Sequence, residues 1–250
     1  MIHTLNPIPP NRNQKPNLCA ATCLQMILGR RGIEYGYSLE NLAVQLGLYI
    51  DEEDKDMFGE ELRRRTLKHG SAEIGLLFDD FKKPEKLGLI KSIWGIDAKV
   101  LHPSEIGIRK IKDFLVAEIE KGNDIMLNYR LEPFNGRTDG HYVLMFALNE
   151  DTNDIYVSDP SPFVQEYWKA KLGRFLWAMK PRWKEDDNKK RERGFVIFSG
   201  PMNKEKDNPQ SVDNLVMGVG DYVAVDARID KRTPFPVPYQ STRNRPSQGN

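Results

Sequence analysis

The sequence has little cysteine, no long apolar run and no excess of charge of either sign. Two cysteines in 250 residues exclude a small secreted scaffold held together by several disulfides. No stretch approaches the roughly 18 consecutive apolar residues of a membrane-spanning helix, so we predict no membrane insertion. The 37 Lys and Arg nearly cancel the 36 Asp and Glu, leaving a net charge of +1. This balance favours neither a nucleic-acid partner nor an acidic membrane surface.

The N-terminus also lacks the basic and apolar regions of a secretory signal peptide. We therefore expect a cytoplasmic protein, or one exported without a signal peptide in the manner of an effector. The 4 Trp, 9 Tyr and 11 Phe are enough to build a hydrophobic core, which excludes a wholly disordered chain. The sequence leaves the oligomeric state undetermined.

Apolar periodicity divides the chain into a helical first half and a strand-rich second half. Helices are expected at 18–28, 39–48, 60–69, 81–94 and from 104 or 105 onwards to a stop at Gly122. Strands are expected at 98–101, 124–130, 142–148, 154–158 and 194–198. A turn at 149–153 joins two of these strands into a hairpin. Because helices and antiparallel strands are segregated, the sequence predicts an α+β fold rather than a parallel α/β sheet.

Composition divides the chain into three segments. Residues 1–13 are rich in Pro and Asn and are expected to form an extended N-terminal arm. Residues 14–200 are expected to form one domain. Residues 201–250 are expected to be a C-terminal extension, at least partly flexible, with a possible hairpin at 214–229 and a Pro-rich tail at 233–250.

The first candidate for chemistry is Cys19. Asn17 is a favourable N-cap, which would place Cys19 at the second helical position, where free amides and the helix dipole favour a thiolate. Cys23 lies one turn deeper and is expected to be a small buried hydrophobe. The C-x3-C spacing has no second pair of ligands, so we expect no zinc site and no other cofactor. A disulfide within one helical turn is disfavoured by geometry.

A base for a cysteine nucleophile must come from elsewhere in the chain. His141 follows Gly140 at the start of an apolar strand, and Asp159 closes the next strand. The hairpin between them returns both residues to the same end of the ribbon, where Asp159 can hold the imidazole by a hydrogen bond. Gln14, shortly before Cys19, can supply a side-chain amide that joins the Cys19 backbone N–H in an oxyanion hole.

These residues resemble the active site of papain-like cysteine peptidases. The nearest likeness is to the bacterial peptidases that cleave double-glycine leaders in bacteriocin exporters, and the chain is also similar to papain-like effector proteases. The resemblance covers about residues 14–200 and rests on Gln14 with the run Cys19 to Leu28, on Gly140-His141-Tyr142-Val143 and on Val157-Ser158-Asp159-Pro160. It implies Cys19 as nucleophile, His141 as base, Asp159 as the group that orients the base and Gln14 as oxyanion donor.

The resemblance therefore implies a thiol hydrolase that acts on a protein or peptide substrate and needs no cofactor. Two alternatives stay open. The same triad can carry out acyl transfer or deamidation, with an amine replacing water or a glutamine replacing the peptide bond. The chain can also be a catalytically inactive papain-like binding module, because Ala20 follows the cysteine where many family members have Gly or Trp, and residues 30–123 diverge.

Overall fold

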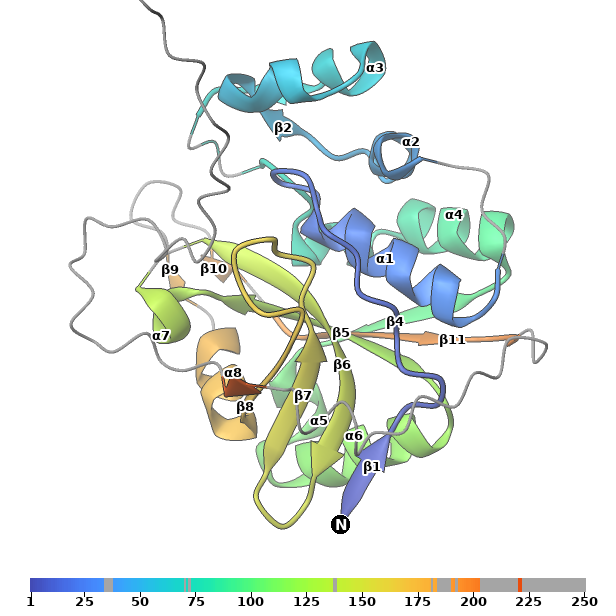
Figure 1. The fold of residues 1–250 in the computed structure, drawn as a ribbon, viewed down its shortest axis with the longest axis vertical. Coiled ribbons are helices and arrows are strands. Elements are labelled where there is room, and N and C mark those ends of the chain that lie inside the picture. The colour runs from blue at the N-terminus through green and yellow to red at the C-terminus, as the bar shows by residue number, and fades with distance from the viewer. Residues whose placement is uncertain are drawn as a thin grey trace, which may run out of the picture.

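The structure of the chain is a computed structural model (Figure 1). It describes residues 1–33, 38–69, 71, 73–136, 139–180, 182–183, 190–191, 193–202 and 220–221. Every predicted site residue lies within these ranges. The tail predicted at 233–250 lies outside the described residues, as does the hairpin predicted at 214–229 apart from residues 220–221.

A large sheet forms the centre of the molecule (Figure 1). Among the described residues it has eight strands in the order β12-β8-β7-β6-β5-β11-β4, with β1 paired to β6. The strands are β1 (Ile2–Thr4), β4 (Asp97–Leu101), β5 (Asp124–Arg130), β6 (Gly140–Asn149), β7 (Asp154–Ser158), β8 (Tyr167–Lys171), β11 (Phe195–Ser199) and β12 (Gly220–Asp221). The pairings are antiparallel except for β12 with β8. The predicted hairpin is confirmed as β6 and β7, with a register shift between Met145 and Ala147.

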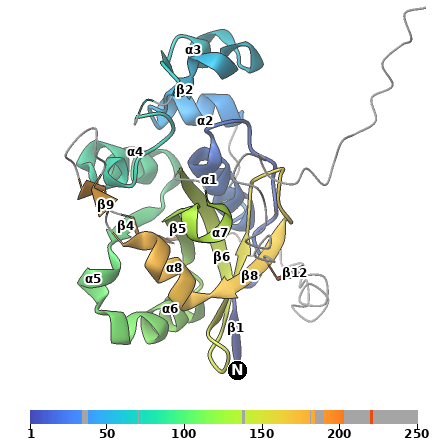
Figure 2. The same cartoon turned by 90° about the vertical axis from the view of Figure 1, so that its left-hand side faces the viewer.

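Helices cover both faces of this sheet (Figures 1 and 2), and the predicted α+β class is confirmed. The longer helices are α1 (Cys19–Arg30), α4 (Pro84–Trp94), α6 (Ile111–Glu120) and α8 (Leu172–Met179). The shorter ones are α2 (Leu39–Gln45), α3 (Glu60–Arg63), α5 (Pro103–Ile106), α7 (Glu132–Asn135) and the 3-10 turns η1 (Glu52–Met57), η2 (Phe78–Lys82) and η3 (Ile108–Lys110). Two small ribbons pair β2 (Ile50–Asp51) with β3 (Thr66–Leu67) and β9 (Arg182–Trp183) with β10 (Lys190–Arg191). Among the described residues, none of the helices has the length and apolarity needed to cross a membrane.

Strand β6 is buried on both sides and joins two hydrophobic cores. Tyr142 and Leu144 belong to the core that contains α1, α2 and α4. Val143 and Met145 belong to the core that contains α6 and α8. This division follows from the two-residue period of a strand, which sends successive side chains to opposite faces. Helix α1 is therefore packed directly on the strand that carries His141.

Buried charges anchor the C-terminal end of α1. Arg31 donates from Nε to Asp124 Oδ2 at 2.6 Å, and Arg30 donates to the other carboxylate oxygen. These three side chains are at most 1% exposed. Arg31 also donates to the carbonyl oxygen of Phe198 at 2.8 Å. The ion pairs thus tie α1 to β5 and β11 and fix the direction in which the helix presents its N-terminus.

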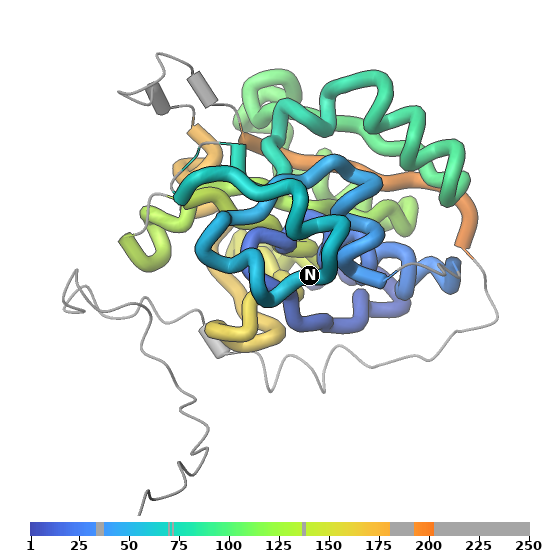
Figure 3. Tube along the Cα trace, turned by 90° about the horizontal axis from the view of Figure 1, so that it is seen from above, coloured from blue at the N-terminus to red at the C-terminus, as the bar shows by residue number. Residues whose placement is uncertain are grey.

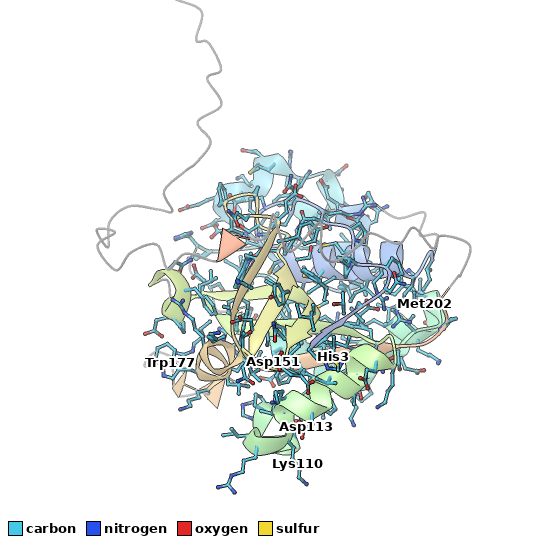
Figure 4. All side chains as sticks on the ribbon, turned by 60° about the horizontal axis from the view of Figure 1, so that its bottom comes forward. His3, Lys110, Asp113, Asp151, Trp177 and Met202 are labelled. Carbon is cyan, nitrogen blue, oxygen red and sulfur yellow. The ribbon has the colours of Figure 1, made fainter. Side chains whose placement is uncertain are left out.

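The extended N-terminal arm lies along the sheet. Its first residues form β1, which pairs antiparallel with β6, and Leu5 and Ile8 are buried in the core. His3 contacts carboxylates on two elements, Glu120 of α6 at 3.1 Å and Glu150 beyond β6 at 2.9 Å. Figure 4 shows His3 and Asp151 at the same end of the molecule as α6.

Several predicted helices are shorter than their periodicity indicates. Ser38 caps α2 as expected, accepting from the Asn41 N–H at 3.2 Å, but the helix ends at Gln45. The helix predicted at 60–69 ends at Arg63, because residues 66–67 pair with β2 instead. The helix predicted from residue 104 or 105 is also wrong at its start. Gly107 adopts a positive φ of 85°, which a helix cannot continue through, and α6 begins only at Ile111.

Candidate active site

Cys19 is the first residue of α1, and Leu18 occupies the N-cap position. The prediction that Asn17 caps this helix is wrong. Asn17 has a left-handed φ of 65°, and its side-chain amide donates a hydrogen bond to Asp54 Oδ2 at 3.2 Å. Its side chain therefore bonds the neighbouring η1 turn instead of capping α1. With Leu18 as the N-cap, Cys19 occupies the first helical position instead of the second. At this N-terminal end of α1, backbone N–H groups have no acceptor within the helix.

The two cysteines differ sharply in environment. Cys19 is partly exposed, whereas Cys23 is fully buried one turn further into α1. Burial raises the pKa of the Cys23 thiol well above its ordinary value, and the charges of Cys19 and Asp159 raise it further. Cys23 is therefore a neutral core residue, as the sequence predicts.

His141 lies buried at the start of β6, with its ring held from one side. Its Nε2 lies 2.8 Å from Asp159 Oδ1, and the Tyr129 ring on the neighbouring strand meets it edge-on at a centroid distance of 6.0 Å. Burial opposes the charged form, but the charge and hydrogen bond of Asp159, followed by the hydrogen bond and charge of Cys19, raise the pKa of His141 to about 10. Because Nε2 is engaged by Asp159, Nδ1 is the ring nitrogen left for Cys19.

Both oxygens of the Asp159 carboxylate accept hydrogen bonds, and the residue is only 2% exposed. Oδ1 accepts a second hydrogen bond from the Ser161 backbone N–H at 2.8 Å, and Oδ2 accepts from the indole N–H of Trp168 at 2.9 Å. Donors on three sides hold the carboxylate in one orientation toward His141. This arrangement follows from the turn after β7 and from the burial of Trp168 on β8.

Trp168 is a site residue that the sequence reasoning missed. Its indole stacks on Phe175 in the core, with ring centroids 5.6 Å apart and an interplanar angle of 15°. A signal was present, because a buried tryptophan generally needs an acceptor for its N–H and Asp159 ends the preceding strand.

Gln14 lies beside the Asp159 turn. Its backbone N–H donates to the carbonyl oxygen of Pro160 at 2.8 Å. Nearby, the Asn11 side-chain amide donates to the carbonyl oxygen of Asp159 at 2.7 Å. The side-chain oxygen of Gln14 is buried and has no hydrogen-bond partner among the described residues. The segment before α1 is thus tied to the end of β7, which brings Gln14, Cys19 and Asp159 into one region.

A cavity of about 130 Å³ opens beside Cys19, on a side that Gln14 does not line. It is lined by the segment 74–79 and by Asn128, Gly140, Tyr142 and Arg193. Seen from above in Figure 3, the chain between α2 and η2 lies over the start of α1. Side-chain contacts agree with this view, because Asn17 bonds Asp54 and Lys15 pairs with Glu40. The segment between α2 and η2 therefore builds one side of the site.

One group of described residues brings three metal-ligating side chains together. Ligand atoms of Asp51, Glu53 and His69 all lie within 4.8 Å of one another. His69 Nδ1 is 2.7 Å from Asp51 Oδ2, and this hydrogen bond, with the nearby carboxylate charges, raises the pKa of His69. The three side chains thus form an ion-pair cluster on the surface, and neither cysteine takes part in it.

A family model matches most of the chain. Residues 7–189 match the Peptidase_C39 like family, a span that covers more than half of the chain and includes Gln14, Cys19, His141 and Asp159. The chain belongs to the Peptidase_C39 like family. It is thereby related to the papain-like cysteine peptidases, and its α+β fold agrees with theirs. No curated protein matches the chain. Membership in the Peptidase_C39 like family supports a peptidase acting on proteins or peptides.

Proposed function

We propose that this Peptidase_C39 like protein hydrolyses a peptide bond with Cys19 as nucleophile, His141 as acid and base, and Asp159 as the orienting carboxylate. The observation that carries the proposal is the hydrogen bond of 2.8 Å between His141 and Asp159 at the N-terminus of the helix that begins with Cys19. A thiol, a base within reach and a third group that orients the base are the three requirements of thiol catalysis.

In the first half of the reaction, the Cys19 thiolate attacks the carbonyl carbon of the scissile bond. The imidazolium of His141 then donates its Nδ1 proton to the leaving amine as the C–N bond breaks, which leaves a thioester on Cys19. A raised pKa supports this role, because His141 is protonated at neutral pH and holds the proton that the amine needs. In the second half, neutral His141 takes a proton from water, which attacks the thioester and releases the acid.

The oxyanion is expected to be held by the Cys19 backbone N–H and the Gln14 side-chain amide. The Cys19 N–H belongs to the first helical residue and has no intrahelical acceptor. Gln14 would donate through its side-chain NH₂ group, and the bond from its backbone N–H to the Pro160 carbonyl oxygen at 2.8 Å holds the residue beside the Asp159 turn.

The test uses the full chain and a proteome-derived peptide library, with products identified by mass spectrometry. Cys19→Ala should abolish cleavage, whereas Cys23→Ala, a matched change one turn further along α1, should keep it. New peptide termini indicate hydrolysis. Conversion of glutamine to glutamate indicates deamidation, and adducts with an added amine indicate acyl transfer. The absence of any Cys19-dependent product would favour an inactive binding module and contradict the proposal.

A further inference from the structure

The cavity beside Cys19 contains a polar group that the protein itself does not satisfy. Tyr142 is 2% exposed, and its hydroxyl has no hydrogen-bond partner among the described residues. A buried hydroxyl without a partner costs about 1–3 kcal/mol and is rare in native structures. Because Tyr142 lines the cavity, a ligand in the cavity can provide the missing partner.

A guanidinium also lines the cavity. Arg193 Nη1 donates to Asn128 Oδ1 at 3.2 Å, and both residues line the cavity with Tyr142. The group sits against Gly140, where a Cβ atom would come within 2.2 Å of Nη1. The glycine that precedes His141 therefore makes room for a cation next to the base.

These two groups present donors rather than acceptors. Burial, with the charge of Cys19 second, raises the pKa of Tyr142 well above its ordinary value, so its hydroxyl stays protonated. Arginine has donors only. The one acidic residue lining the cavity in the described part of the chain is Asp79, whose side chain is 54% exposed and lies 3.7 Å from Lys82. It is thus at the solvent side and partly neutralised.

The segment 74–79 forms a largely apolar wall of the cavity. Its lining residues include Ile74, Leu76, Leu77 and Phe78, of which Leu76 and Phe78 are buried. This wall suits the methylene groups of a side chain, while Tyr142 and Arg193 suit an acceptor at its end. A carboxylate can accept from both donors at once and carries the charge opposite to that of Arg193.

We propose that this cavity binds an acidic side chain, glutamate or aspartate, of the substrate peptide close to the scissile bond. Its carboxylate accepts hydrogen bonds from the Arg193 guanidinium and the Tyr142 hydroxyl. The inference rests on the proposed peptidase activity, because it assigns the substrate preference of that same site. Arg193 and Tyr142 are specificity residues in this assignment and take no part in bond cleavage.

The cleavage profile of the peptide library tests this assignment. The wild-type chain should enrich Glu or Asp at one fixed position near the cleaved bond, and peptides with Gln at that position should be cleaved about 10- to 100-fold less efficiently in kcat/KM, the range for hydrogen bonds to a charged group. Arg193→Gln should remove this difference, and Arg193→Glu should shift the enrichment toward Lys and Arg. Arg64→Gln, at an exposed arginine that directly follows α3, is the matched control and should leave the profile unchanged.

Tyr142→Phe separates recognition from folding. Because the hydroxyl has no partner in the part of the chain that the structure describes, its removal should leave the melting temperature equal or higher, while the ratio of kcat/KM for Glu over Gln peptides falls. Cys19-dependent cleavage with no acidic preference, or with a preference that survives Arg193→Gln, would overturn the inference and leave the peptidase proposal standing. Cleavage that survives Cys19→Ala would overturn both.

Discussion

The indole N–H of Trp168 donates to Asp159 Oδ2 at 2.9 Å, so the carboxylate that holds His141 is itself held by a buried side chain. This contact joins the hydrophobic core to the candidate active site. Trp168 stacks on Phe175 of α8, and its position therefore depends on the packing of that helix. The orientation of His141 is consequently set by the core as well as by the turn after β7.

Replacing Trp168 by Phe should keep most of the packing and remove the donor. A buried hydrogen bond to a charged acceptor contributes about 1.5–3 kcal/mol, so we expect a loss of stability of that order and a lower kcat. Without this donor, Asp159 should also orient the His141 imidazolium less well, and the shape of the pH–rate profile should change. Phe175→Leu is the matched control. It should lower the melting temperature with little change in the pH profile, and equal pH effects in both variants would contradict the role given to Trp168.

The two thiols should react at very different rates. Cys19 is partly exposed, begins a helix and lies beside a protonated imidazole, whereas Cys23 is buried and its pKa is raised. Iodoacetamide near neutral pH should therefore alkylate Cys19 much faster than Cys23, as measured by peptide mapping over time. His141→Gln should slow the labelling of Cys19. Faster labelling of Cys23 would mean that the wrong cysteine has been assigned.

The raised pKa of His141 also predicts how stability changes with pH. The folded value is about 10, against about 6.5 for an unperturbed histidine. A raised folded pKa contributes stability that is fully present below about pH 6.5 and is lost as the pH rises toward about 10. Urea unfolding across this range should show the wild-type chain losing its advantage over His141→Gln as the pH rises. A difference that does not depend on pH would show that His141 does not titrate in this way.

Asp124 should be among the most sensitive positions for stability. It is fully buried and balances the two buried guanidinium groups of Arg30 and Arg31. Asp124→Asn removes the charge and should cost about 3–5 kcal/mol of unfolding free energy, because both cations are left uncompensated. Glu60→Gln breaks an exposed pair with Arg64 and should cost no more than about 1 kcal/mol. Similar losses in denaturant titrations of the two variants would contradict this account of how α1 is anchored.

Local sequence signals predicted the elements that carry the candidate site. The apolar run after Cys19 marks α1, and the turn at 149–153 marks the hairpin that brings His141 and Asp159 together. Helix boundaries were less predictable, because residues 66–67 pair with β2 and Gly107 interrupts a regular apolar pattern. The cap at Asn17 failed because its side chain bonds Asp54, a contact between segments far apart in the chain.

Features made by distant segments could not be predicted from local patterns. The Trp168 contact depends on the pairing of β7 with β8, and Arg193 reaches Asn128 only because β11 pairs with β5. The cavity wall at 74–79 is distant in sequence from Asn128, Gly140 and Tyr142 and meets them only in the folded chain. Periodicity reports which side of an element is buried, and it carries no information about which distant side chain lies opposite.

Covalent trapping at the candidate site tests the central claim most directly. A peptidyl acyloxymethyl ketone reacts with a thiolate that is held beside an acid and an oxyanion hole, and intact-mass measurement with peptide mapping locates the adduct. The account predicts one adduct for each chain, on Cys19, formed about 100-fold or more slowly in His141→Gln, in keeping with the usual contribution of acid–base catalysis. An adduct on Cys23, or an adduct on Cys19 that forms equally fast without His141, would contradict it.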